Sequence, residues 1–172
     1  TVEETRKQLK IVMLGHKRIP SREGGIEIVV EELYTRMVAL GNEVTCYNRS
    51  GHHVSDKEFD AGKLNTFKGV KLKTVPTIDR KGLAAVTSSF FGAFGAAFGH
   101  YDVVHFHAEG PCAMMWLPKL FRKRCVATVH GLDWQREKWK NGFGSKYIRF
   151  GEKVAVKCAD EIIVLSKGVH DY

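Results

Sequence analysis

Short apolar segments alternate with longer amphipathic segments along most of the chain. Residues 11–14 form a continuous apolar run, and the segment after it carries apolar residues at helical spacing, at Ile26, Val29, Val30, Leu33 and Met37. The run predicts a strand covered on both faces, and the stripe predicts a helix that faces a core. Gly41–Asn42 then provides a helix stop. The first unit is therefore a strand over 10–14, a loop over 16–25 and a helix over 26–40.

The same order recurs to the end of the chain. We expect further strands over 43–48, 70–75, 102–107, 125–129 and 160–166, and helices over 83–98, 111–122, 146–158 and 167–172. The polar segment over 49–68 predicts an exposed excursion. Strand–helix alternation predicts an α/β fold with a doubly wound, mostly parallel sheet and helices on both faces. Since the chain stops inside the last expected helix, we expect the natural protein to continue.

Charge and cysteine usage narrow the choice of partner and compartment. The 172 residues suffice for one domain, and 27 Lys and Arg against 19 Asp and Glu give a net charge of +8. This balance favours an anionic partner such as a nucleotide, a nucleic acid or an acidic membrane surface. The basic residues are scattered and no motif reads DNA or RNA, which argues against a nucleic acid. The four cysteines form no C-x-x-C pair and the first residues show no signal-peptide pattern, so we expect free thiols in a reducing cytosol.

The segment over 83–98 is the most apolar part of the chain and holds no charged residue. Its Phe90, Phe94 and Phe98 share one helical face. At 16 residues it is shorter than the roughly 20 residues of a membrane span. Two interpretations stay open: a core helix that packs through its small residues, and a helix whose aromatic face contacts a bilayer or a lipid-linked substrate.

Candidate binding residues follow three of the expected strands. They are Gly24–Gly25, residues 107–110 and residues 130–133. In doubly wound sheets, ligands bind at the carboxyl ends of the strands, where the strand order reverses. We therefore expect these three groups to converge on one site.

The glycine pair in the first loop predicts an anion site. A helix N-terminus carries unpaired backbone N–H groups and a partial positive charge, and glycines let a phosphate approach closely. Lys17, Arg18 and Arg22 add positive charge to this loop. Glu27 could instead occupy the helix end that we assign to a ligand. The spacing matches neither the G-x-G-x-x-G fingerprint nor the P-loop, so no particular nucleotide fold is indicated.

Histidines and acids at the other two strand ends supply candidate chemistry. His105 and His107 share one face of a strand, so they could form a polar pocket floor, or a zinc site with His130 or Glu109 as third ligand. His130 could donate a hydrogen bond to a phosphate or a sugar hydroxyl. Glu109 and Asp133 could accept a hydrogen bond from an acceptor hydroxyl or act as a base. Hydrolysis through an acyl-enzyme is not favoured, because there is no G-x-S-x-G motif and no activated thiol.

Four motifs, taken in order and spacing, carry a family resemblance. They are Ile11–Gly15 with Pro20 and Gly24–Glu27, then Tyr101–His107, Thr128–Asp133 and Ala159–Ser166. Together they resemble the N-terminal domain of glycosyltransferase family 4, and look closest to the rhamnosyltransferase-like branch that builds bacterial surface polysaccharides. The resemblance covers the chain from about residue 9 to its end.

The resemblance implies retaining sugar transfer by one half of a GT-B fold, which pairs two Rossmann-like domains. It implies that Gly24, Gly25 and the helix end at Ile26 approach the diphosphate of a nucleotide-sugar donor. It places His130 near the donor sugar, as the catalytic residue of this half. It assigns the face toward the acceptor to Glu109, Asp133 and Ser166.

The resemblance also implies a second domain that these 172 residues do not include. That domain would carry the basic pair that stabilises the leaving diphosphate and the glutamates that grip the nucleotide, with no metal or other cofactor needed. We therefore expect residues 1–172 to be the acceptor-side domain, which alone neither binds the donor tightly nor turns over. The expected acceptor is a saccharide or a lipid-linked saccharide, reached in the cytoplasm at the inner face of the membrane through a peripheral contact. The alternative is a non-catalytic Rossmann-type nucleotide-binding module.

Overall fold

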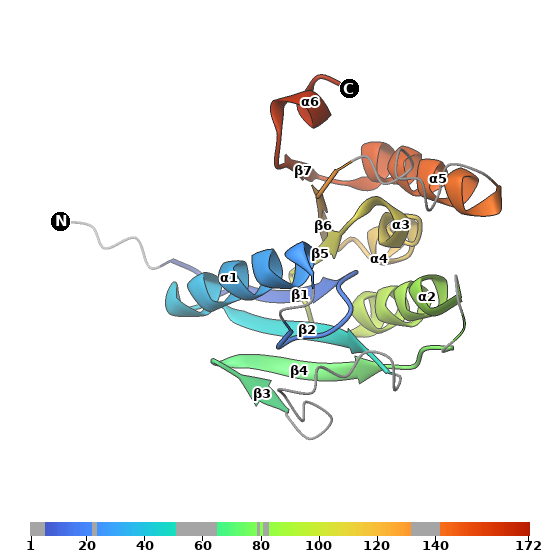
Figure 1. Cartoon of the computed structure of the whole chain (residues 1–172). Helices are drawn as coiled ribbons and strands as arrows, with labels where there is room; N and C mark the ends of the chain where they lie inside the picture. The colour runs from blue at the N-terminus through green and yellow to red at the C-terminus, as the bar shows by residue number, and fades with distance from the viewer. Residues whose placement is uncertain (1–5, 22–23, 51–64, 79, 81–82, 132–141) are drawn as a thin grey trace.

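A central β-sheet organises the part of the chain that the computed structural model describes, which is residues 6–21, 24–50, 65–78, 80, 83–131 and 142–172 (Figure 1). Within these residues seven strands lie in the order β3-β4-β2-β1-β5-β6-β7. The strands are β1 (Lys10–Leu14), β2 (Glu43–Arg49), β3 (Thr66–Phe67), β4 (Val70–Val75), β5 (Val103–His107), β6 (Arg124–Val129) and β7 (Glu161–Val164). The helices are α1 (Gly25–Ala39), α2 (Leu83–Phe98), α3 (Glu109–Cys112), α4 (Trp116–Leu120), α5 (Phe143–Cys158) and α6 (Lys167–His170).

The sheet is parallel except for the short strand β3, which pairs antiparallel with β4. β1 occupies the centre, where Ile11 is paired with Val44 of β2 on one side and with Val103 of β5 on the other. From β1 the chain proceeds to β2 in one direction, and from β5 it proceeds through β6 to β7 in the other. The strand order therefore reverses between β1 and β5, which confirms the predicted doubly wound α/β fold.

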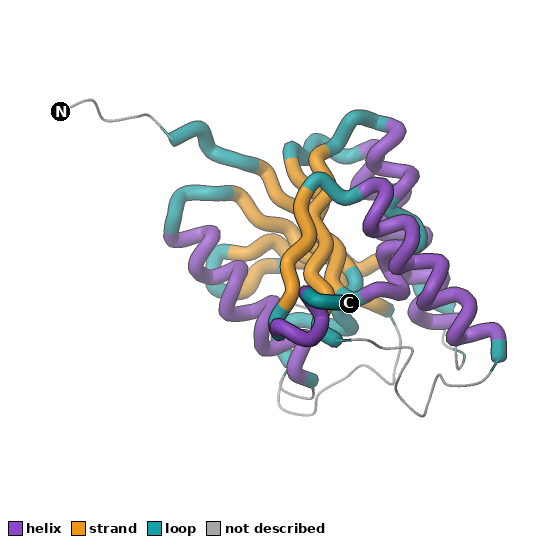
Figure 2. The backbone as a smooth tube through the Cα atoms, turned by 90° about the horizontal axis from the view of Figure 1, so that it is seen from above, coloured by secondary structure: helices purple, strands orange, loops and turns teal. Residues whose placement is uncertain are grey.

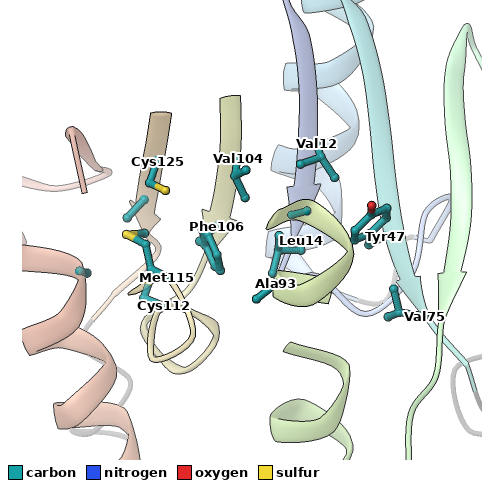
Figure 3. Packing of buried hydrophobic residues seen from close by; sticks show 13 residues of the cluster. Val12, Leu14, Tyr47, Val75, Ala93, Val104, Phe106, Cys112, Met115 and Cys125 are labelled. Atoms are coloured by element: carbon teal, nitrogen blue, oxygen red, sulfur yellow. The ribbon is translucent and has the colours of Figure 1, made fainter. Parts of the chain in front are cut away.

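Helices cover both faces of the sheet (Figure 2). α1 packs through Val30 and Tyr34 against one face, where Met13 and Cys46 are fully buried. α2 and the segments from α3 to α5 pack against the opposite face, and Figure 3 shows the resulting cluster with members from both layers. This two-sided burial explains why β1 is a continuous apolar run: alternate residues of the strand face different cores.

Several details of the sequence-based assignment differ from the structure; α5, for example, begins at Phe143 and not at residue 146. The single helix expected over 111–122 is wrong, because it divides into α3 and α4. Between them the N–H groups of Ala113, Met114 and Met115 bond to carbonyls three residues back, and Pro118 has no N–H to continue an α-helical ladder. The polar segment over 49–68 contains the edge strand β3, although its residues 51–64 lie outside the described part.

Several local predictions are confirmed. Gly41, with a φ of +89°, ends α1 in a Schellman turn: its N–H bonds to Val38 O at 2.9 Å, and the N–H of Asn42 bonds to Met37 O at 3.1 Å. The four cysteines are free thiols, three of them buried. Among the described residues, no helix has the length and apolar character needed to cross a bilayer.

Candidate functional site

The carboxyl ends of β1, β5 and β6 meet where the strand order reverses, and the candidate site is built there. Gly15 follows β1, His107 ends β5, and His130 follows β6. Gly15 has a φ of +104°, and a Cβ at this position would collide with the backbone carbonyl of His107. Only glycine can bring β1 and β5 this close at the reversal point. The main-chain geometry of β5 is also unusual here, since Ala108 adopts a φ of +76° although it has a Cβ.

Three imidazoles form a row across the ends of β5 and β6. The His105 and His107 rings are stacked with centroids 4.3 Å apart, and the His107 and His130 rings follow at 5.4 Å. Nδ1 of His107 and Nε2 of His130 are hydrogen-bonded at 3.1 Å, and Nε2 of His105 is bonded to Thr128 Oγ1 at 2.6 Å. His130 is thereby fixed by a buried neighbour rather than left to rotate on a loop.

A fourth imidazole stands at the end of β1. His16 Nε2 is bonded to Asn48 Oδ1 at 2.9 Å, and the Asn48 amide also bonds the backbone N and O of Ile19, each at 3.0 Å. Asn48, from β2, therefore holds the loop that follows β1 in place. The Tyr34 ring is in T-shaped contact with both His16 and His107, with ring centroids 6.3 Å and 6.4 Å apart, so α1 connects the imidazoles of β1 and β5.

Burial keeps three of these imidazoles neutral. It lowers the pKa of His16 and of His105 to about 4 in each case. For His107 the pKa lies well below its usual value, first because of burial and then because of the neighbouring imidazoles. At physiological pH these rings act as hydrogen-bonding groups and not as cations.

Two nitrogens in this cluster have no hydrogen-bond partner among the residues that the structure describes. Nε2 of His107 and Nδ1 of His16 are buried and form no hydrogen bond within the described residues. Because buried polar atoms are nearly always paired, unpaired ones at the reversal point of a sheet indicate a place where a water or a ligand is bound.

The end of α1 at which the sequence predicts an anion is occupied by the helix's own Glu27. Glu27 is buried, its Oε1 accepts a hydrogen bond from the Lys17 N–H at 3.0 Å, and its carboxylate folds back over Gly24. This is the alternative that the sequence left open for Glu27. Gly25 stays exposed, and no described atom would lie within 4 Å of a Cβ there. An anion at this helix end would therefore have to displace the Glu27 carboxylate or bind beside it.

The other candidate residues occupy different surroundings. Glu109 begins α3 beside His107 but is only 1% exposed, because α5 packs on this turn so closely that a Cβ at Gly151 would collide with the Glu109 carbonyl. Ser166 is exposed beyond β7, and its Oγ caps α6 by accepting from the Val169 N–H at 3.3 Å. Asp133 lies outside the described residues.

Sequence reasoning missed several members of the site. Tyr34, Asn48 and Arg49 were not identified, although Asn48 and Arg49 end β2 and strand ends carry the other site residues. Arg49 is half-buried, and burial lowers the pKa of its guanidinium while the nearby Glu27 raises it. The weak alternative of a zinc site gains no support: within the described residues no three His, Cys, Asp or Glu side chains form a metal-binding group.

Comparisons with known proteins identify the family of this chain. The model of Glycosyltransferase Family 4 matches residues 23–172. No curated protein sequence matches the chain.

Two solved structures share the fold. Sucrose-phosphate synthase from Thermosynechococcus elongatus superposes with a TM-score of 0.68 at 19% identity, over 96% of this chain and 44% of that one. Alr3699/HepE from Anabaena, whose structure holds UDP and glucose, superposes with a TM-score of 0.57 at 9% identity, over 91% of this chain and 38% of that one. The chain thus spans less than half the length of either protein, and the predicted Rossmann-like half of a GT-B fold is confirmed. On the match over residues 23–172, the chain belongs to glycosyltransferase family 4.

Proposed function

We propose that this chain is the acceptor-side domain of a retaining glycosyltransferase, which moves a sugar from a nucleotide-sugar donor to a saccharide or a lipid-linked saccharide. The observation that carries the proposal is the row of imidazoles at the reversal point of the sheet. His130 at its outer end is held by a buried neutral His107, 3.1 Å away. A hydrogen-bonding group that is held in one orientation at a strand end can bind a sugar hydroxyl or a phosphate oxygen.

The proposed reaction divides the chemistry between two domains. The bond from the anomeric carbon to the diphosphate breaks, the acceptor hydroxyl oxygen bonds to the same carbon, and the hydroxyl proton leaves with the diphosphate. The second domain would stabilise the diphosphate through basic groups. In this chain His130 would hydrogen-bond the donor sugar, Gly25 would leave room for the diphosphate, and Glu109, Asp133 and Ser166 would belong to the acceptor side.

Finer features of the function are part of this proposal. We assign the enzyme to surface-polysaccharide synthesis on the cytoplasmic side of a bacterial membrane, in a rhamnosyltransferase-like branch. The net charge of +8 supports the proposal that the enzyme acts at an acidic membrane surface. UDP and glucose in the Anabaena structure favour nucleotide sugars as the first donors to test.

The test is a donor screen with the protein and its second domain, followed by His130→Ala. We expect release of the nucleoside diphosphate with one donor class, and a fall in kcat of about a hundredfold in the variant, the usual scale for a lost hydrogen bond in a transition state. His100→Ala is the matched control, because His100 is exposed at the far end of α2. Full activity of His130→Ala, or micromolar binding of NAD by the chain in calorimetry, would contradict the proposal and favour the nucleotide-binding module.

A further inference from the structure

Helix α2 is packed with its small residues inward and its large ones outward. The residues that face the sheet are Ser88, Ser89, Gly92, Ala93, Ala96 and Ala97, all buried. The four phenylalanines of the helix, at positions 90, 91, 94 and 98, are 41–58% exposed. Amphipathic helices of globular proteins normally bury their largest apolar side chains, so this arrangement calls for a partner outside the chain.

The aromatic rings cannot turn inward. A Cβ at Gly92 would already be in van der Waals contact with Leu14 and Tyr47, and one at Gly95 would approach the Tyr47 hydroxyl to 3.2 Å. The backbone of α2 therefore lies against the sheet without space for larger groups. With 3.6 residues per turn, the phenylalanines are held on the outer face of the helix.

The exposed apolar surface continues from α2 onto α4. The Phe94 ring packs on Phe98 with centroids 4.6 Å apart, and Phe98 packs on Phe121, again at 4.6 Å. Trp116 is 43% exposed and Leu120 71%. We call this surface the aromatic patch, made up of Phe90, Phe91, Phe94, Phe98, Trp116, Leu120 and Phe121.

Basic residues follow one end of the aromatic patch. α2 contains no charged residue, and α4 leads directly into Arg122, Lys123 and Arg124. Arg122 is exposed and forms no ion pair within the described ranges, while Lys123 Nζ donates to the backbone carbonyls of Gly99 and Tyr101. The adjacent helix α5 exposes Phe150 among basic residues, at positions 146, 149, 153 and 157.

We propose that the aromatic patch docks this protein on an anionic lipid bilayer. Phenylalanine and tryptophan rings between basic side chains are the composition of a surface that enters the headgroup region and pairs with lipid phosphates. A second copy of the chain fits poorly, because it would bring two basic rims together. Helix α2 begins at the carboxyl edge of the sheet, where the site lies, and ends at the opposite edge, where Phe98 packs on Phe121.

The test measures binding of the protein to vesicles, and it requires no sugar transfer. Flotation with phosphatidylcholine vesicles containing phosphatidylglycerol should show binding that falls as salt rises, and phosphatidylcholine alone should bind much less. The double variant Phe94→Ala, Phe98→Ala should weaken binding at least about tenfold, because two apolar rings are no longer transferred from water into the bilayer. Arg122→Gln should weaken it about fivefold.

Matched controls come from α1 on the opposite face of the sheet. Ile28→Ala with Leu40→Ala removes side chains that are 49% and 62% exposed, and Arg36→Gln removes an exposed charge; both should bind vesicles like the unaltered protein. The proposal is overturned if vesicles do not bind, if the phenylalanine variant binds unchanged, or if the patch instead mediates self-association that this variant abolishes. A failed donor screen leaves this result intact, because binding and transfer are measured separately.

Discussion

At the scale of single residues, the buried histidines make the fold sensitive to acid. The pKa of His16 and that of His105 are lowered to about 4, whereas an unfolded chain protonates histidine near the ordinary value of 6.5. Between these values the unfolded state binds more protons than the folded state, so stability falls as the pH falls.

We therefore predict a loss of stability between about pH 6.5 and pH 4, amounting to roughly 1 kcal/mol per pH unit for each of these two imidazoles. Urea unfolding at several pH values measures it. His105→Gln should reduce the slope by about one proton. An unchanged slope in the His105 variant would refute the assignment.

Gly15 gives a second prediction at this scale. Gly15→Ala introduces a Cβ at a φ of +104° that would collide with the His107 carbonyl, so we expect it to destabilise by about 3 kcal/mol or more and to loosen the hydrogen bond of His107 to His130. Gly25→Ala is the matched control, because no described atom would lie near its Cβ and α1 gains a better helix former. Thermal unfolding should show a large loss in the first variant and none in the second.

Among the site residues, those that end an apolar run could be predicted from the sequence. His107 and His130 follow buried strands, and glycines near a helix start suggest an anion. Tyr34 and Asn48 could not be found in this way, because their roles depend on contacts between elements far apart in the sequence: Tyr34 meets His107, and Asn48 holds Ile19.

At the scale of elements, the N-terminus of α1 depends on Glu27. Its carboxylate accepts from the Lys17 N–H and lies at the positive end of the helix, so Glu27→Ala should cost about 1–2 kcal/mol in the free energy of unfolding. Glu32→Ala, which removes an exposed pair with Arg36 on the same helix, should cost less than about 0.5 kcal/mol. Equal losses in denaturant titrations would argue against a special role for Glu27.

Glu27 also bears on ligand binding at the same helix end. If it competes with a phosphate for the N–H groups, Glu27→Gln should bind inorganic diphosphate more tightly than the unaltered protein, by about threefold to tenfold. Calorimetry measures the two affinities. Unchanged binding would mean that an anion does not use this end of α1.

Helix α2 reverses the usual rule for large apolar side chains. Ala96 is fully buried, so Ala96→Leu should destabilise by about 1–3 kcal/mol through overpacking, whereas Phe94→Ala should cost less than about 1 kcal/mol because that ring is half exposed. Chemical denaturation separates the two. A large loss in the Phe94 variant would show that the ring stabilises the fold from within.

The extent of most elements could be predicted from the sequence, but the face of α2 that packs on the sheet could not. Periodicity identifies a helical face, and it does not tell which face meets the sheet when both faces are apolar. In α2 the available space determines which face meets the sheet, because the Tyr47 side chain of β2 leaves room only for glycines at positions 92 and 95. The same limit applies to residues 111–122, where the spacing is helical but proline divides the helix.

At the scale of the whole molecule, the strand order creates one binding edge. Parallel strands bring every carboxyl end to the same edge, and the reversal between β1 and β5 separates α1 from α2 across the sheet. That arrangement follows from strand–helix alternation and right-handed crossovers, which is why the fold class could be predicted from the sequence.

By itself, this chain forms only one side of the proposed binding cleft. A nucleotide sugar gains affinity when a closed cleft covers most of its surface, and the proposed division of labour gives this chain only one wall of that cleft. The buried neutral imidazoles contribute hydrogen bonds but no positive charge toward a diphosphate. Residues 1–172 alone should therefore bind nucleotide sugars no more tightly than about millimolar and should transfer no sugar. Calorimetry and a diphosphate-release assay test both statements. Binding in the low micromolar range, lost in His130→Ala, would show that this half alone holds the donor, and the second wall would then serve the acceptor.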